Sequence, residues 1–401
     1  MPNNSLKQCL ARMGVAVFIS YLSVAVALPV VPIFVAQELG LANWLGGFAV
    51  GAAFISTILS RNYAGFYADV RSPKKCTLLG LLYYISAAGV CLASAYCCIP
   101  KSTAFFVLII GRLILGLGES MTLVGLTSWN LAQLGPQYSG RILSIVGIAM
   151  YGAFAVGGPI GIMIYEQHGF AAVMGISTLL PLIGGGLLIS AADVSPQMNI
   201  APRVPFLKIT HLIWKQGTVV CLQGVGFAVL GAFISLYFKS KGWPYAGYGI
   251  SLFGIGFVVS RILFSGLPDK IGGIGLAFFS LIVEMLGQGL LWGAQDVSIA
   301  LIGALLTGLG CSMIFPAMGV EVIKQVPQGL RGTAFGGFAA FQDVAYAFSA
   351  PIAGWLADTF NYSSVFLLGA MAAASGLAIV ISMRYTPKPK RNLTVIEEKS
   401  N

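Results

Sequence analysis

The stretch "SRNYAGFYAD" at residues 60–69 places an arginine and an aspartate eight positions apart in an otherwise apolar neighbourhood. The chain repeats this arrangement two hundred residues later, as "SRILFSGLPD" at residues 260–269. Serine, arginine and aspartate stand at the same places in both stretches. A chain that carries one charged pair twice, at such a separation, is predicted to contain two copies of one structural unit.

The composition decides the class of protein. Hydrophobic residues make up 57% of the 401 residues and charged residues only 9%, against about 25% charged in a typical soluble protein. Mean hydropathy is +0.87. Apolar runs of about 20 residues are long enough to cross a bilayer as helix. Twelve such spans are predicted, at residues 11–35, 43–67, 76–99, 103–130, 139–165, 170–190, 214–238, 245–267, 273–294, 298–323, 332–356 and 362–385. We therefore expect an all-α integral membrane protein.

The positions of the basic residues set the expected orientation. Most of the 23 lysines and arginines fall in predicted loops on the side that carries both termini, and only Lys101, Lys239 and Lys241 fall on the other side. Because cytoplasmic loops are rich in Lys and Arg, both termini are expected in the cytoplasm. This sorting accounts for the net charge of +10 and makes nucleic acid an unlikely partner.

Several features receive a purely structural interpretation. The first span has full transmembrane length instead of the short apolar region of a cleavable signal, so we expect it to remain attached. Pro29 and Pro32 are expected to kink that span. The seven cysteines lack the spacing of a disulfide framework or a zinc site and are interpreted as small apolar residues. They are Cys9, Cys76, Cys91, Cys97, Cys98, Cys221 and Cys311.

A polar, proline-containing segment at residues 191–213 divides the chain almost at its middle. It is predicted to be a cytoplasmic linker between two six-helix halves, residues 1–190 and 214–385, followed by a cytoplasmic tail at 386–401. An even number of spans in each half keeps both copies in the same orientation, as parallel repeats.

The two halves align at two different offsets. "GLGESM" at 116–121 returns as "GLGCSM" at 308–313, an offset of 192, whereas the arginine and aspartate pair returns at 200. The third and ninth helices, or their loops, must therefore differ by about eight residues.

Each repeated aspartate is predicted to end the second helix of its half at the cytoplasmic face. The arginine lies about 12 Å deeper along the helix axis and cannot pair with the aspartate directly. Arg61 and Arg261 must find partners on other helices or extend to the membrane interface. Interfacial anchoring is the alternative, but it explains two copies less well than one.

These residues resemble the major facilitator superfamily of secondary transporters over essentially the whole chain. The loop signature of that family is matched by Gly65, Ala68, Asp69 and Lys74, and by Asp269, Lys270 and Gly272; the fourth-helix signature is matched by Arg112, Gly116 and Gly118. "GGPIG" at 157–161 approximates the antiporter pattern. The stretches "GRLILGLGES", "LQGVGFAV", "SLYFKSKGW" and "FPAMGVEVIKQVP" are similar to the bacterial YfcJ and YhhS branch of sugar-efflux-like permeases.

The resemblance implies a fold of two six-helix bundles around a cavity with alternating access. It also implies that Asp69 holds the halves together on the cytoplasmic side against helix eleven, in the outward-open state. A carboxylate near a helix N-terminus gains about 0.3 to 1 kcal/mol. The candidate latch residues are Arg61, Asp69, Lys74, Arg261, Asp269 and Lys270.

Ionisable residues at bilayer depth cost at least about 2.5 kcal/mol each, so they are functional candidates. Four stand out: Arg112, Glu119, Glu284 and Asp343. At offset 192, Arg112, Glu119 and Asp343 correspond to the neutral Ala304, Cys311 and Tyr151. The fold thus accepts neutral residues at these places, which favours function over architecture for the charged copies.

Location separates these candidates further. In the family, helices three, six, nine and twelve lie outside the cavity, so Glu284 on the ninth is as well explained by bonds to neighbouring helices as by transport. Four polar residues at similar depth would orient a substrate or fill helix interfaces: Tyr21, Gln223, Gln342 and Tyr346.

Arg112 and Glu119 are seven residues apart, about 10.5 Å along the axis on nearly one helix face. Water or substrate fits between them more easily than a direct pair. We hypothesise that Glu119 takes up and releases the coupled proton, and that Arg112 tunes it or holds an anionic group. A static polar contact is the competing interpretation.

No phosphate-binding loop of an ATP-driven pump and no zinc spacing is visible, and no cofactor is expected. The favoured function is proton-coupled export of a small organic solute, sugar-like or drug-like, by a monomer in the bacterial inner membrane. Proton-coupled uptake is the alternative, and an intramembrane enzyme or receptor-like protein is the remote one.

Overall fold

A computed structural model describes residues 3–95, 100–135, 138–191, 193, 206–264, 267, 271–326 and 331–385, with the side chains of 3–9, 139–140, 143, 206–210, 331–333 and 335 outside the described part. Every secondary-structure element among the described residues is a helix. Its elements are α1 (Asn3–Ala27), α2 (Val30–Ile33), the π-helical η1 (Phe34–Glu38), α3 (Asn43–Val70), α4 (Pro73–Ala93), α5 (Lys101–Leu134), α6 (Ser139–Ile189), α7 (Phe206–Ser240), α8 (Tyr248–Phe264), α10 (Gly273–Gly293), α11 (Val297–Gln325), α12 (Arg331–Thr359) and α13 (Ser364–Tyr385).

These elements confirm the twelve predicted spans. Nine described segments are long and apolar enough to cross a membrane. One of them, α6, contains Gly169 at φ 73 and ψ −178, a conformation that glycine adopts readily, and the chain reverses there to cross twice. The shorter α8 and the more polar α12 complete the set.

The first span is interrupted where the prolines stand. α1 ends at Ala27 and the helix resumes at Val30, with Pro29 as the residue before it. A proline supplies no backbone N–H and disturbs the preceding turn, so the kink has a local cause. The span then ends in one π-helical turn, η1.

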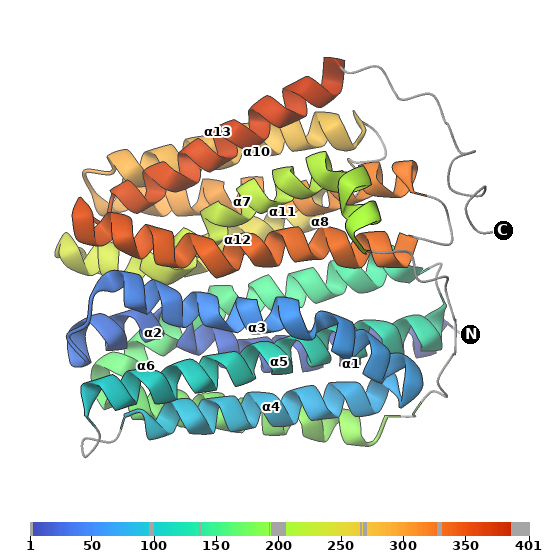
Figure 1. The fold of residues 1–401 in the computed structure, drawn as a ribbon, viewed down its shortest axis with the longest axis horizontal. Helices are drawn as coiled ribbons and strands as arrows, with labels where there is room; N and C mark the ends of the chain where they lie inside the picture. Colours follow the sequence, from blue (N-terminus) through green and yellow to red (C-terminus); the bar gives the residue numbers. More distant parts are fainter. Residues whose placement is uncertain are drawn as a thin grey trace.

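The spans form two groups that lie side by side (Figure 1). Helices α1 to α6 pack with one another, and helices α7 to α13 do the same. Two long seams join the groups, α3 against α12 and α6 against α8. The beginning of α1 and the end of α13 lie at the same end of the bundle, which we call the terminal end; the opposite end is the far end (Figure 1).

Equivalent glycine contacts demonstrate the repeat in three dimensions. A Cβ at Gly116 would overlap the carbonyl of Ala53, and a Cβ at Gly308 would overlap the carbonyl of Phe253. The glycine of this contact recurs 192 residues later, from Gly116 on α5 to Gly308 on α11. The residue it meets recurs 200 residues later, from Ala53 on α3 to Phe253 on α8. The two halves therefore use one packing scheme, with small residues where helix backbones meet.

The same contacts locate the eight-residue difference between the copies. α4 and α10 both have 21 residues, and they align at offset 200 because Gly118 packs on the backbone of Tyr84 as Gly310 packs on that of Glu284. α5 and α11 align at 192. The extra residues of the first half thus lie between the end of α4 and the first turns of α5. The third and ninth predicted helices, which are α4 and α10, have equal lengths.

The boundary of the central segment differs from the prediction. α7 begins at Phe206, inside the segment 191–213 that was expected to be linker. The end of α6 is bound by basic side chains from its own half: Lys74 Nζ donates to the carbonyls of Ile189 and Ala191 at 2.8 and 2.6 Å, and Arg12 donates to Leu187. These contacts satisfy the carbonyls that a helix C-terminus leaves free.

Candidate functional site

The interior of the bundle contains an ion pair that joins its two groups of helices. Arg61 Nη2 of α3 donates to Asp343 Oδ2 of α12. The side chains are only 23% and 11% exposed. The sequence left Arg61 either a partner on another helix or the membrane interface, and the structure gives it a partner, one of the candidate acids.

Glu119 lies close to this ion pair. Its Oε1 accepts a hydrogen bond of 2.9 Å from the hydroxyl of Tyr21, which is buried. Glu119 itself is partly exposed and interacts electrostatically with both Asp343 and Arg61. The Arg61–Asp343 pair is the direct contact, and Glu119 acts on both of its members through the electrostatic field, with no ion pair of its own within 4.0 Å among the described residues.

Aromatic residues pack around this polar group. We define the central aromatic cluster as Tyr21, Phe54, Tyr151, Phe154, Phe227, Phe253, Phe257 and Tyr346. The hydroxyls of Tyr151 on α6 and Tyr346 on α12 are 3.3 Å apart. Tyr346, a predicted substrate contact, thus belongs to the junction between the two halves.

The repeat explains how the two seams differ. Arg261 is the second-half copy of Arg61, and Tyr151 is the first-half copy of Asp343. Arg261 lies over the ring of Phe257 at 5.3 Å and near Tyr151, so a cation–π contact stands where the other seam has an ion pair. Only the α3–α12 seam has an acid at this level within the described residues.

Arg112 binds the backbone of a neighbouring helix. Its side chain is 2% exposed, and Nε donates to the carbonyl of Ala49 at 2.9 Å. Described side chains include no ion pair between Arg112 and Glu119. This geometry favours a bond between α5 and α3, the static interpretation, for Arg112.

The remaining cavity candidates have separate positions. Gln342 is partly buried beside the ion pair on α12, and Gln223 of α7 is 1% exposed. Glu284 is fully buried on α10. Gln223 and Glu284 belong to a second polar group, described below.

The structure places only part of the predicted latch. Asp69 is exposed at the end of α3, and Lys74 binds the end of α6. Asp269 and Lys270 lie outside the described residues. The latch therefore stays a prediction.

Sequence reasoning missed a contact at the far end. Asp358, in the last turn of α12, accepts hydrogen bonds from the backbone N–H of Asn43 and Trp44 at 3.0 Å each and from Asn43 Nδ2 at 2.8 Å. Tyr362 donates to Asn43 Oδ1 at 2.9 Å. We call these four residues the far-end clasp. Because Ala42 precedes α3 and has no capping side chain, the acid from α12 takes that role.

Glycines tighten the seam behind the clasp. A Cβ at Gly47 would overlap the carbonyl of Ala350, and a Cβ at Gly51 would overlap that of Ala347. On the other seam, Gly247 and Gly254 pack in the same way on Pro159 and the Tyr151 carbonyl. The far end is therefore closed by direct backbone contact along both seams.

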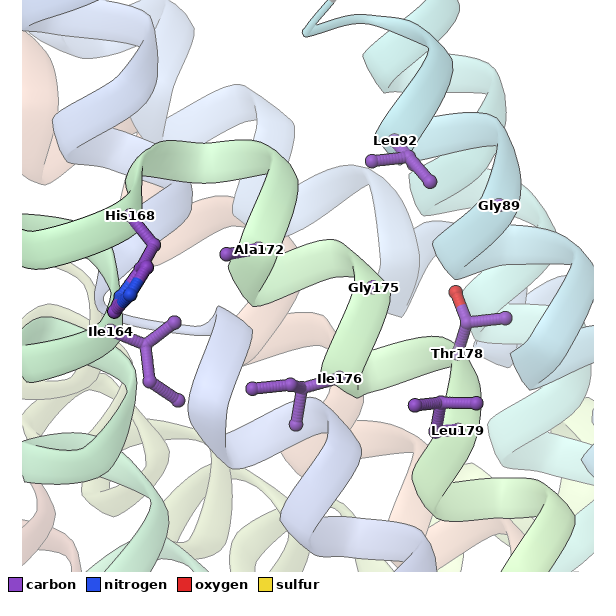
Figure 2. Close-up of a pocket in the computed structure, with 9 residues that line it drawn as sticks. All are labelled: Gly89, Leu92, Ile164, His168, Ala172, Gly175, Ile176, Thr178 and Leu179. Atoms are coloured by element: carbon purple, nitrogen blue, oxygen red, sulfur yellow. The ribbon is translucent and has the colours of Figure 1, made fainter.

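A surface groove lies apart from these residues (Figure 2). It is lined by Gly89, Leu92, Ile164, His168, Ala172, Gly175, Ile176, Thr178 and Leu179 of α4 and α6. The lining is mainly apolar, and Leu179 is 58% exposed. Such a surface suits contact with lipid, so the groove contributes nothing to the polar site.

Comparison with known proteins decides the family. The model of the Major Facilitator Superfamily matches residues 13–291 and 218–400. The chain belongs to the major facilitator superfamily. An uncharacterised MFS-type transporter of Salmonella typhimurium strain LT2 is 40% identical over 95% of this chain and 97% of its own length. One of Burkholderia pseudomallei strain 1106a is 35% identical over 90% and 88%.

Solved structures of superfamily members have the same fold. The human organic anion transporter MFSD10 superposes with a TM-score of 0.69 at 14% identity, over 95% of this chain and all of that one. A variant of the nucleoside transporter NupG gives 0.74 at 13%, over 94% and 99%. This superfamily member is accordingly a multi-pass membrane transporter for small molecules and not an enzyme.

Proposed function

We propose that this transporter couples the export of a small organic solute to proton movement across the bacterial inner membrane. Sugar-like and drug-like molecules are the first classes to test. The similarity of its sequence to the sugar-efflux-like YfcJ and YhhS branch supports export. The fold shared with an organic anion transporter and a nucleoside transporter carries no substrate to this chain.

The observation that carries the proposal is the Arg61–Asp343 ion pair across the seam, with Glu119 interacting electrostatically with both of its members. Asp343 and Arg61 belong to opposite sides of a seam, and any rocking of one half against the other changes their separation. Glu119 and Arg61 belong to the same half. A proton on Glu119 removes the competing charge and strengthens the hold of Arg61 on Asp343. Proton binding is thereby coupled to the seam.

Tyr21 adds a second effect. Its hydroxyl donates to Glu119. An ionised carboxylate only accepts hydrogen bonds, whereas a protonated one also donates. Protonation therefore changes the bonding of Tyr21, which is packed in the central aromatic cluster against Phe154 at 6.4 Å between ring centroids. The aromatic faces are suited to a sugar ring or an apolar drug.

The test compares metabolites in cells with and without the gene, alongside cells that express Glu119→Gln. Export predicts a solute that accumulates inside the deletion strain and is cleared by the intact gene alone. A solute depleted inside the deletion strain would show uptake instead. Identical metabolite profiles under solute challenge would remove the support for this proposal.

A further inference from the structure

A second buried polar group lies in the other half, between α7, α10 and α11. Glu284 and Gln288 are 0% exposed, Gln223 is 1% exposed and Cys311 is 2% exposed. Gly226 makes room for it, because a Cβ there would overlap Glu284 Oε1. None of these side chains contacts the Arg61–Asp343 pair.

The hydrogen bonds of this group do not balance. Gln288 Nε2 donates to the carbonyl of Gly226 at 3.1 Å. Both oxygens of Glu284 and the side-chain oxygens of Gln223 and Gln288 lack a nitrogen or oxygen donor among the described residues, and the Cys311 thiol, a weak donor, faces Glu284 and Gln223. The four buried acceptors thus outnumber the donors that face them, among which the Cys311 thiol is weak, and a buried acceptor without a donor is destabilising.

No cation compensates the carboxylate. The described residues include no basic side chain within 4.0 Å of Glu284. Cys311 of α11 is its titratable neighbour, while α7 presents Gln223 and Gly226, and α13 presents Gly369 beside Gln288. An unpaired carboxylate in such surroundings is strongly disfavoured. A bound proton removes the charge and supplies a donor to one of the amide oxygens.

The repeat relates this group to the first one. Gly118 packs on the backbone of Tyr84 as Gly310 packs on that of Glu284, so Tyr84 and Glu284 are equivalent positions. Glu119 and Cys311, which directly follow the two glycines, are a second equivalent pair. Each half therefore places one acid at the same helix contact, and only the acid of the second half, Glu284, is fully buried. In the first half the acid comes from α5, and in the second half it comes from the opposite helix, α10.

We propose that Glu284, within this buried polar group, is a second proton-binding site, which exchanges its proton during the conformational cycle. Its part in coupling rests on the proposed function, but its occupancy does not. Opening of the half around α7 and α10 would give Glu284 contact with water. Gln223 and Gln288 would hold the protonated form when these helices close again.

The test is infrared spectroscopy of the purified protein in proteoliposomes, with the proton itself as the ligand. We expect a carbonyl band of a protonated carboxylic acid at neutral pH that is lost in Glu284→Gln and kept in Glu119→Gln. Transfer to D2O under an imposed pH gradient should shift this band, while the amides of α10 stay protected. Gln223→Leu removes an acceptor and should shift the band in a protein that keeps Glu284.

Two results would overturn the proposal. If wild type and Glu284→Gln have the same carboxylic acid bands and Gln223→Leu shifts none, Glu284 is ionised. If the band is present but takes up no deuterium under the gradient, Glu284 is a static packing group. Neither readout requires a transported solute, so failure here is distinct from failure of the export proposal.

Discussion

Arg61 of α3 and Asp343 of α12 form an ion pair across the seam between the two halves, although 282 residues separate them in the chain. The equivalent arginine on the other seam, Arg261, meets aromatic rings instead of an acid. The transporter therefore has two seams of similar packing and unequal electrostatics. Among the described residues, only the α3–α12 seam pairs opposite charges.

Removal of one partner of this pair should destabilise the protein. Arg61→Gln leaves Asp343 without its cation in the interior. We expect a loss of about 1 to 3 kcal/mol, below the about 3 to 5 kcal/mol typical of a fully buried pair, because both side chains retain some exposure. Thermal unfolding of the purified protein in detergent measures it. Arg61→Gln combined with Asp343→Asn should recover part of the loss.

Arg261→Gln is the matched control, since it removes the equivalent arginine where no acid is paired. Its effect should be smaller. Equal losses for both arginine variants, or a double variant as unstable as the sum of the single ones, would contradict the role of the ion pair.

The far-end clasp should bias the conformational equilibrium. Asp358→Ala removes the acceptors at the start of α3, a cap worth about 0.5 to 2 kcal/mol. We expect the far end to open more often. In a background without other reactive cysteines, Val50→Cys, at a position now 2% exposed, should then react faster with a membrane-impermeant maleimide.

Asp296→Ala provides the comparison, because Asp296 caps α11 within its own half by accepting from Ile299 N–H at 3.0 Å. It removes an acidic cap without touching a seam and should leave the labelling rate unchanged. If the far-end clasp has no influence on the conformational equilibrium, Asp358→Ala and Asp296→Ala should give equal labelling rates at Val50→Cys.

Close backbone packing makes a steric prediction at the same seam. Gly47→Ala places a methyl group against the Ala350 carbonyl and should force α3 and α12 apart at the far end. Gly89→Ala adds the same methyl group where nothing lies within 4 Å. The cysteine of Val50→Cys should react faster with the maleimide in the Gly47→Ala variant only. Unchanged reactivity in Gly47→Ala would mean that α3 and α12 can accommodate the methyl group without separating.

The predicted latch at the terminal end remains open to test. Asp69→Asn should shift the equilibrium toward states open at that end. It removes the negative charge that is expected to interact with the N-terminus of the eleventh span, α12. Asp269→Asn should have less effect. Labelling of single cysteines at both ends would detect the shift, and unchanged accessibility would leave only interfacial anchoring.

The sequence predicted the twelve spans and the repeat because apolar length and repeated motifs are local properties. The sequence left open whether the eight-residue difference between the two halves lay in helices or in loops. The contacts of Gly118 with α4 and of Gly310 with α10 show which residues of the two halves are equivalent, and so settle this point. The start of α7 at Phe206 was not predicted, since the segment before residue 214 mixes polar and apolar residues without a clear boundary.

The candidate site was predicted as a list of residues and not as a set of contacts. Arg61 was assigned to a latch and Asp343 to the cavity, because nothing in the sequence links positions on α3 and α12. Asp358 was overlooked since an acid at the end of a span suggests an interfacial anchor. The absence of a capping side chain at Ala42 was the one available signal.

Glu119→Gln provides the most direct test of proton coupling. The measurement is transport, by proteoliposomes, of the solute found by the metabolite comparison, with and without an imposed proton gradient. Glutamine preserves the shape and the hydrogen bond from Tyr21 but takes up no proton, so we predict that gradient-driven accumulation is lost while exchange of solute across the membrane continues. Accumulation against a gradient at the wild-type rate would contradict the assignment of Glu119 as the coupling site.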